Sequence, residues 1–446
     1  MTSLLRPSSM LRLTLVLAAG ACAGGGAMRV SDVTPQQIPT LEAQKGQRPQ
    51  DANTLTRLGV AYFKAERYAD ARPVLDSAVA HDPSNGVAAI YLGMTAEQLG
   101  DFGTAKRAYQ SYVALASNSE LKRTAQQRLA LVDRRQLEYQ ARQALASEAS
   151  LSQMPPESNT VAVMPFNYGG SNADIRPLTR GLAQLLVTDL AKSRQVRVLE
   201  RERMQAIVDE MKLSDSSRAD PTTAVRSGHL LRAARVVQGT LTDMPNSQLR
   251  VNAVVVDVAT AGAGGTASGA DQLNRLFDLE KQIAFSLFNA MGVQLAPAER
   301  DAIDQRPTQN IQAFLAYSRG LVAQDQGDFA AAQADFNDAV NLDPSFRAAS
   351  QGAAAAGDLG AASQTSVTQT EQTVSQTAQL PSAPSASLAD ALNNGANSTN
   401  PTSGSQTSGD NSTGTQSGDT KPVSNMTNGN GAAPPTGTIV IIIKRP

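Results

Sequence analysis

The side chains that most often do chemistry are scarce in this chain. It holds two histidines, His81 and His229, a single cysteine, Cys22, and no tryptophan. No HExxH, CxxC, Gly-x-Ser-x-Gly or Walker sequence is present, so the usual signatures of metalloproteases, redox dithiols, serine hydrolases and nucleotide-binding loops are missing. The sequence therefore predicts no catalytic residue, no metal site and no cofactor.

Each remaining polar candidate has an ordinary structural interpretation. His81 stands at the end of an expected helix, where a cation is favoured, and His229 has no second ligand or nucleophile beside it in the sequence. The glycines in Asn167–Ser171 precede a helix but lack the spacing and the lysine of a phosphate loop, which favours a turn. The charged run Glu200–Arg203 is expected to be solvated or to form surface ion pairs worth at most about 1 kcal/mol each.

Cys22 indicates a covalent modification. The apolar run Leu13–Ala21 is too short to cross a bilayer, which needs about 20 apolar residues, so residues 1–21 are predicted to be a signal peptide. The run ends in Ala18-Ala-Gly-Ala-Cys22, which resembles the cleavage box of bacterial lipoproteins and implies that Cys22 is lipidated. Ordinary cleavage with an incidental cysteine is the weaker alternative, because a lone exposed thiol in an oxidising compartment is a liability.

The longest stretch with alternating strand and helix patterns runs from Thr160 to Leu295. Apolar runs predict strands at 161–166 and 196–199, and amphipathic helix patterns follow both. Two further strands, 235–241 and 248–258, are joined by a turn and predict an antiparallel hairpin, which a helix over 271–291 would cover. This order predicts a mixed β-sheet with flanking helices.

Four segments of this stretch carry a family resemblance. They are the runs Val161–Phe166, Val198–Ile207, Leu230–Gly239 and Leu249–Thr260. In this order and spacing they are similar to the domain shared by the curli-transport lipoprotein CsgG, the TolB amino-terminal domain and related envelope lipoproteins. The resemblance implies a CsgG/TolB-N-like domain over residues 159–295.

The chain departs from the CsgG pattern at two slots beside the last strands. CsgG-type channels carry long amphipathic hairpins there, whereas this chain has only Asp243–Ser247 and the glycine-rich Ala261–Gly269. A membrane-crossing strand needs about 9–11 residues, so two such strands fit in neither slot. The resemblance therefore implies the domain without the pore.

The composition of the chain limits the kinds of partner and of packing to expect. Lys and Arg number 39 and Asp and Glu 40, for a net charge of -1, which gives no electrostatic reason to expect nucleic acid. The chain is 41% apolar but only 4% aromatic. These values predict helical packing rich in Ala and Leu, spread over two or three domains.

The amino-terminal part repeats itself. Three pairs of positions are 34 residues apart, namely Pro49 and Pro83, Gly59 and Gly93, and Tyr68 and Phe102. This is the tetratricopeptide period, in which each unit is a pair of antiparallel helices. We expect a tether and a half repeat over 22–48, two repeats over 49–118, and a capping helix over 119–150.

Helices that open each unit line the concave face of such arrays, and that face suits a partner's helix or extended segment. The position predicts a partner groove of seven residues: Asn53, Thr56, Val60, Phe63, Ile90, Met94 and Glu97. The alternative is that these side chains pack internally, because only two repeats are adjacent.

A third repeat follows the central domain, over 308–348. Gly93, Phe102 and Ala105 recur 227 positions later as Gly320, Phe329 and Ala332. Because a single repeat cannot bury both of its faces, we expect it to dock on the central domain or on the first two repeats.

The carboxy-terminal segment is predicted to be disordered over 349–437. No aromatic residue follows Phe346, and Ser, Thr, Gln, Asn, Gly and Ala dominate, so too little apolar surface is available to offset chain entropy. A strand over 438–446 ends it, with an uncharged β-branched run expected to dock on a sheet edge through Ile439, Ile441 and Ile443. A membrane-surface contact and a protease-recognised tail are the alternatives.

Together these features predict a non-enzymatic bacterial envelope lipoprotein. It would be anchored by Cys22 in the outer membrane, facing the periplasm, and would act as a protein interaction scaffold in the assembly or transport of envelope or surface components. Expected partners are envelope proteins bound through the repeats, with membrane contact through the lipid anchor only, no nucleic acid, and self-association into a homo-oligomer left open. The alternatives are a subunit of a CsgG-like outer-membrane export complex and a lipoprotein activator of peptidoglycan synthases.

Overall fold

The computed structural model describes residues 28–214 and 216–380. Within these residues a six-stranded mixed sheet has the order β3-β1-β4-β5-β6, with β2 paired to β4. β1, β2 and β3 pair in parallel with their neighbours, and β4, β5 and β6 form an antiparallel meander. The strands are β1 Glu157–Val163, β2 Asn167–Tyr168, β3 Arg197–Val198, β4 Ala233–Met244, β5 Gln248–Asp257 and β6 Gly262–Gln272.

Helices cover both faces of this sheet. Val161 and Val163 of β1 belong to a core that includes α8 (Leu178–Leu190) and α11 (Leu276–Ala290). The alternate residues Ala162 and Met164 belong to a second core with α9 (Arg201–Glu210) and α10 (Pro221–Leu231). Because successive side chains of a strand point to opposite faces, one short apolar run serves both cores, which confirms the predicted mixed sheet with flanking helices.

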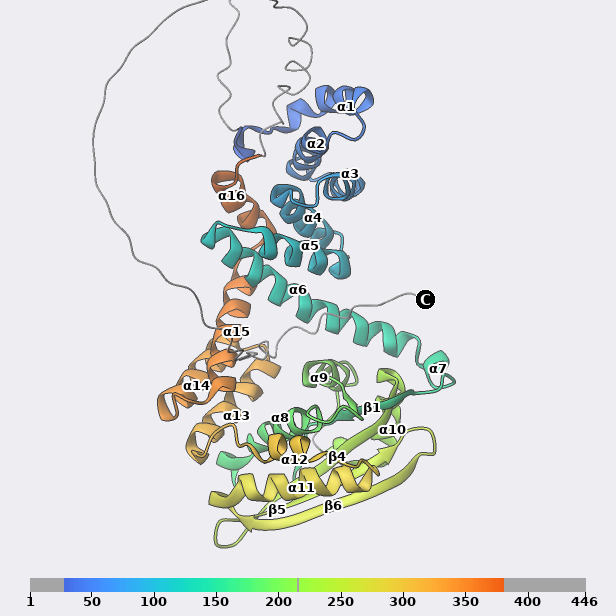
Figure 1. Ribbon diagram of the computed structural model, residues 1–446, viewed down its shortest axis with the longest axis vertical. Helices are drawn as coiled ribbons and strands as arrows, with labels where there is room; N and C mark the ends of the chain where they lie inside the picture. Colours follow the sequence, from blue (N-terminus) through green and yellow to red (C-terminus); the bar gives the residue numbers. More distant parts are fainter. Residues whose placement is uncertain (1–27, 215, 381–446) are drawn as a thin grey trace, which may run out of the picture. The chain divides into compact units, whose positions relative to one another are not determined.

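The sequence predicted no further strand in the central domain after residue 258, and the structure has one. The glycine-rich slot Ala261–Gly269 is not a loop, because β6 covers nearly all of it and extends to Gln272. Its small residues let α11 lie directly on the strand (Figure 1): a Cβ added at Gly269 would stand 2.5 Å from Leu279 Cδ1, and one at Gly265 would stand 2.6 Å from Ala290 Cβ. The helix expected from Asp271 begins only at Leu276 for the same reason, since Asp271 still pairs with Leu249 of β5.

The repeats form five helices over residues 38–115. They are α1 Ile38–Gln47, α2 Ala52–Lys64, α3 Tyr68–His81, α4 Gly86–Gln98 and α5 Phe102–Leu115. The side chains of Asp51, Asn85 and Asp101 accept hydrogen bonds from backbone amides at the starts of α2, α4 and α5, which satisfies donors that a helix start leaves free.

A glycine sets the close approach of the two helices in each unit. A Cβ added at Gly59 would overlap the Leu75 side chain, and one at Gly93 would stand 2.7 Å from the Tyr109 ring. Such close approaches leave no room for a methyl group. The glycines therefore let the two helices of each unit pack closely.

The long helix expected after the repeats is α6, Ser119–Ala146, followed by the short α7, Glu148–Leu151. Leu121, Ala125 and Val132 of α6 belong to the core of the repeats, whereas Ala141 belongs to a core of the sheet domain. One helix therefore packs on α5 with its first half and on α9 with its second half.

The third repeat is the helix pair α13 (Ile311–Asp325) and α14 (Phe329–Leu342), preceded by α12 (Pro297–Asp304). It shares one continuous core with the sheet domain, so of the two expected docking places the structure shows the central domain. α13 packs on α8 at Gly181, where an added Cβ would stand 2.8 Å from Phe314 Cζ. Phe277 of α11 also meets Phe314, with ring centroids 5.3 Å apart.

The expectation that Glu200–Arg203 is solvated or forms surface ion pairs was wrong for Arg201. This side chain is 2% exposed and its Nη1 lies 2.5 Å from Asp325 Oδ1 on α13. Arg180 of α8 binds the other oxygen of Asp325 at 3.0 Å. The charged run lies where the third repeat docks, a contact between segments more than 100 residues apart.

The predicted disorder was wrong for residues 349–377. The structure has two helices there, α15 (Arg347–Gln364) and α16 (Val367–Thr377). Ala349, Ala353 and Ala356 recur at helical spacing and are buried in the core that α14 lines. Small side chains suffice because the large ones come from the neighbouring helix: a Cβ at Gly352 would stand 3.1 Å from the ring of Phe336.

Several predictions lie outside the described residues. These are the signal peptide 1–21, the lipidation site Cys22, the disordered segment from 381 to 437, and the carboxy-terminal strand with Ile439, Ile441 and Ile443. No helix of residues 28–214 and 216–380 is both long and apolar enough to cross a membrane.

Candidate protein-binding face of the repeats

The seven residues predicted to line a groove lie on α2 and α4, and the structure shows what surrounds them. Six of the seven are buried, namely Thr56, Val60, Phe63, Ile90, Met94 and Glu97, and Asn53 is half-buried. We call these residues, together with Lys64 and Tyr91, the repeat face. A free concave surface would leave such side chains exposed, so these side chains are covered, partly by packing within the repeats and partly by another segment.

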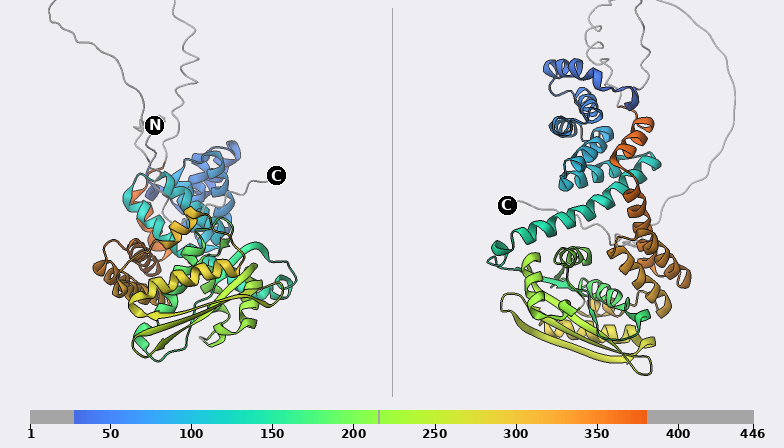
Figure 2. Two further views of the ribbon diagram at one scale, coloured as in Figure 1. Left: turned by 60° about the horizontal axis from the view of Figure 1, so that its bottom comes forward. Right: turned by 180° about the vertical axis from the view of Figure 1, so that it is seen from behind.

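The covering segment is the chain's own α16, together with the short helix η1 (Val30–Asp32). Val367 and Val374 of α16, Val30 of η1 and the neighbouring Val33 and Leu380 belong to the same core as the apolar residues of the repeat face. Figures 1 and 2 show α16 beside α4 and the start of α6, which it contacts. The repeat face thus holds an amphipathic helix.

Polar contacts fix the position of α16. Lys64 donates to Val30 O at 2.9 Å, to Val33 O at 3.0 Å and to Ser375 Oγ at 3.0 Å. These contacts use all three donors of an ammonium group. Glu371 Oε1 lies 3.9 Å from Lys64 Nζ, and it accepts a hydrogen bond of 2.8 Å from the Tyr91 hydroxyl.

Burial shapes the ionisation of both groups that hold Glu371. Burial lowers the pKa of Lys64, and the carboxylates of Glu371 and Asp32 oppose that change. Burial, and after it the Glu371 carboxylate, raises the pKa of Tyr91 well above its ordinary value. The tyrosine therefore stays a hydrogen-bond donor at neutral pH, and Glu371 supplies its acceptor.

A second cluster holds the junction between α15 and α16. Arg128 of α6 forms a buried, two-pronged ion pair with Glu97, and its Nη1 also donates to Thr365 O at 2.7 Å. Glu97 further accepts from Tyr109 at 3.0 Å and from Arg135 at 2.9 Å. The predicted groove residue Glu97 thus anchors the turn that leads into α16, through Arg128.

The sequence contained a signal for α16 that the disorder prediction overrode. Ser366 and Gln369 form a reciprocal capping box, with Gln369 N donating to Ser366 Oγ at 3.1 Å and Ser366 N donating to Gln369 Oε1 at 2.8 Å. The sequence S-x-x-Q before an apolar position is a known helix start. Val367, Thr370 and Val374 then follow at helical spacing and are buried.

Phe63 and Thr56 have structural roles within the repeats. The Phe63 ring meets Tyr91 and Tyr68 with centroids 5.4 and 5.2 Å away. Thr56 Oγ1 accepts from Asn85 Nδ2 at 2.9 Å, which ties one unit to the next. The alternative of internal packing, left open by the sequence, therefore describes these two side chains.

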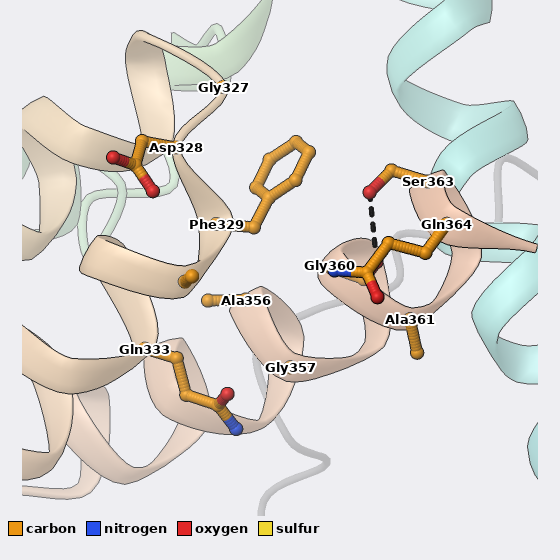
Figure 3. A pocket seen from close by; sticks show the side chains of 11 residues that line it. Gly327, Asp328, Phe329, Gln333, Ala356, Gly357, Gly360, Ala361, Ser363 and Gln364 are labelled. Atoms are coloured by element: carbon orange, nitrogen blue, oxygen red, sulfur yellow. Dashed lines mark hydrogen bonds between the residues drawn. The ribbon is translucent and has the colours of Figure 1, made fainter.

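Two hollows lie away from the repeat face. One of about 320 Å³ lies between α14 and α15 (Figure 3), lined by small residues with Phe329 and Gln333. Two of its polar side chains are already hydrogen-bonded: Asp328 caps α14, and Ser363 Oγ donates to Gly360 O at 2.8 Å. The other, of about 730 Å³, lies where α13 begins, and its Asp343 accepts from Thr308 and Ser345.

A buried charge cluster joins α8 and α11. Lys281 Nζ lies 2.5 Å from Asp189 Oδ2 and 3.1 Å from Glu280 Oε2, and Lys192 binds Asp189 at 2.7 Å. Burial, and after it the Asp189 charge, raises the pKa of Glu280 to about 8. Within the described residues no group of three or more His, Cys, Asp or Glu is placed to hold a metal ion.

The comparisons with known proteins match the two kinds of domain. The family model of the curli production assembly/transport component CsgG matches residues 136–264, from the second half of α6 into β6. Two tetratricopeptide repeat models match residues 56–120 and 315–346. These matches confirm that the chain combines a CsgG-like domain with tetratricopeptide repeats.

Comparison with individual proteins gives less. No curated protein matches the chain. Among solved structures, the C-terminal domain of LpoB from Salmonella enterica is 14% identical, with 30% of this chain and 95% of that chain covered and a TM-score of 0.21.

Proposed function

We propose that this chain, which combines a CsgG-like domain with tetratricopeptide repeats, is a non-enzymatic protein interaction scaffold of the bacterial envelope. The combination supports a scaffold in the envelope, because tetratricopeptide arrays bury segments of other proteins. The partner of the scaffold would be an envelope or surface protein during assembly or transport. The proposal needs no cofactor and no nucleic acid.

One observation carries the proposal: the repeat face already holds a helix. Val367, Thr370 and Val374 fill its apolar part, and Glu371 meets Lys64 and Tyr91. Anchors at i, i+3 and i+7 are the pattern by which grooves recognise amphipathic helices. A face with this geometry and charge is suited to a helix from another protein.

The location in the envelope is part of the same proposal. Cys22 would carry the lipid that holds the chain in the outer membrane, facing the periplasm, and one short tether of residues separates it from η1. Replacing Cys22 with Ser should release the protein from the membrane fraction or block its processing. Unchanged retention and processing of this variant would contradict the assignment.

The binding role is tested by capture from crosslinked envelopes with the full chain. Lys64→Glu places a carboxylate where the face now has its ammonium, so the yield of specific partners should fall at least five-fold. Arg48→Glu makes the same charge change at an exposed position at the end of α1 and should leave the yield unchanged. Equal yields from both variants, with equal thermal stability, would contradict the proposed function.

A further inference from the structure

α16 has the features of an occupant that can leave. It is 11 residues long, and it is built largely of Thr, Gln and Ser. Helices of this length are marginal in water by themselves, so α16 depends on the face that it covers. Its opposite side, with Thr368, Gln369, Gln372 and Gln376, is exposed.

α16 is held by the buried side chains of Val367, Thr370 and Val374 and by the polar contacts of Glu371 and Ser375. Its ion pair with Lys64 joins side chains that are 16% and 14% exposed, and its apolar contribution to the core is Val367 and Val374. The junction before it is held separately, since Arg128 binds the carbonyls of Ala362 and Thr365 at the end of α15. Release of α16 therefore leaves α15 and its cap in place.

The face that remains would need an acidic occupant. Tyr91 is fully buried, and its hydroxyl donates to Glu371. If α16 left, water would take the place of Glu371 at this donor and at the Lys64 ammonium. An apolar segment docked there would exclude that water and leave both donors without this acceptor, which is costly. An incoming segment restores both contacts only if it brings a carboxylate to the same place.

We propose that α16 is a built-in competitor for the repeat face, displaced by a partner's amphipathic helix that carries a carboxylate between two apolar residues. The pattern is apolar at i, small and β-branched at i+3, Asp or Glu at i+4 and apolar at i+7, as in Val367, Thr370, Glu371 and Val374. This inference rests on the proposed function and adds the class of partner and its competition with the chain itself. Apparent affinity for the partner is lowered by the fraction of molecules in which α16 is docked.

The test uses a fluorescent peptide with the sequence of residues 366–378 and the full chain, followed by anisotropy. Wild type should bind it weakly, because α16 occupies the face. Val374→Asp places a charge in the core and should free the face, so the peptide should bind at least ten-fold more tightly. The matched control Gln376→Asp adds the same charge to the exposed side of the same helix and should behave as wild type.

The peptide itself tests the chemistry. A peptide with Glu371→Gln should bind the Val374→Asp chain at least five-fold more weakly than the unchanged peptide. Circular dichroism and thermal melting must show that the variant is folded, and Val367→Asp serves as a second way to free the face. If both variants are folded and bind the peptide no better than Gln376→Asp does, or if loss of the carboxylate changes nothing, the inference is wrong.

Hydrogen exchange tests displacement without any variant. Excess peptide added to wild type should speed exchange at the amides of 367–377 and leave those of α4 protected. Unchanged exchange at saturating peptide would overturn the inference. The two proposals can fail separately. If Lys64→Glu loses partners but the peptide does not displace α16, the proposed function holds and this inference is wrong. If the peptide displaces α16 but Lys64→Glu keeps its partners, the proposed function is wrong and the repeat face binds only the chain's own helix.

Discussion

The two places where tetratricopeptide helices are covered differ in what covers them. On the first two repeats the cover is α16, held by two valines and a partly exposed ion pair. On the third repeat it is the sheet domain, held by the Phe277–Phe314 contact, the close approach at Gly181 and the buried Arg201–Asp325 pair, whose side chains are 2% and 7% exposed. By our proposal the α16 cover can exchange. We call the cover of the third repeat, which shares one core with the sheet domain, the permanent contact.

The largest expected effect lies at the permanent contact. Asp325→Ala removes the buried partner of Arg201 and leaves it only the exposed Glu202 at 3.2 Å, a loss that typically costs about 3–5 kcal/mol of unfolding free energy. The matched control is Asp335→Ala, because Asp335 pairs with Arg319 of the same α13 at an exposed site and should cost at most about 1 kcal/mol. Chemical denaturation of both variants measures the difference, and similar losses would break the comparison.

A smaller loss of stability is expected from changes between the two helices of one repeat, and the amino-terminal repeats and the third repeat should lose similar amounts. Gly93→Ala would bring a methyl within 2.7 Å of Tyr109, and Gly320→Ala would bring one within 2.6 Å of Phe336. Overpacking of this kind costs about 1–3 kcal/mol. Thermal melts should show comparable losses for both variants, and a loss confined to one of them would show that the repeats themselves, and not their covers, differ.

The pH dependence of stability should come from the sheet domain, where Glu280 is buried between α8 and α11. The pKa of Glu280 is about 8 in the fold, well above its ordinary value near 4.5, so between these values the folded chain holds a proton that the unfolded chain releases. Its contribution to stability is full below pH 4.5 and is lost as the pH rises toward 8. Glu280→Gln should flatten this fall, by up to about 1.4 kcal/mol per pH unit, in unfolding measured from about pH 5 to 8. A wild-type slope that the variant keeps would contradict the assignment.

The smallest global effect is expected at α16. Glu371→Gln weakens the contacts with Lys64 and Tyr91, which should lower the local stability of α16 by about 1 kcal/mol. Hydrogen exchange should become several-fold faster at residues 367–377, while the midpoint of thermal unfolding hardly moves. A large drop in that midpoint would mean that α16 is part of the cooperative core and that the two covers are alike.

The sequence predicted elements whose apolar pattern is complete within themselves. β1, β4, β5, α8, α9 and the repeat helices each carry their own periodicity, and each was found. β6 was missed because it is rich in glycine, which is unusual in a strand. The glycines are there because α11 packs closely on them, and the local sequence does not show that contact. α15 was missed because its alanines pack against Phe336 of α14, so its lack of aromatic residues says little about burial.

The partner groove stays a prediction, and the burial of its residues was not predicted. The seven residues do lie on the face formed by α2 and α4, as the 34-residue period implies. Part of their cover is α16, which lies more than 250 residues further along the chain, and no local pattern reports a contact of that separation. Lys64 and Arg128 were missed for the same reason, since their acceptors belong to η1, α15 and α16.

The first and last described residues are hydrogen-bonded to each other. Leu380 N donates to Met28 O at 2.9 Å, Val30 N donates to Ala378 O at 3.3 Å, and Arg29 and Gln379 form a β-bridge. The two ends of the described part of the chain therefore lie side by side, and a short covalent linker could join residue 380 to residue 28. Circular permutation succeeds where ends lie close together and new ends fall at exposed tips, and the turn at Pro245 and Asn246 between β4 and β5 is such a tip. We therefore expect a permuted chain, with residues 380 and 28 joined and new ends at the turn between β4 and β5, to form the same helices and strands.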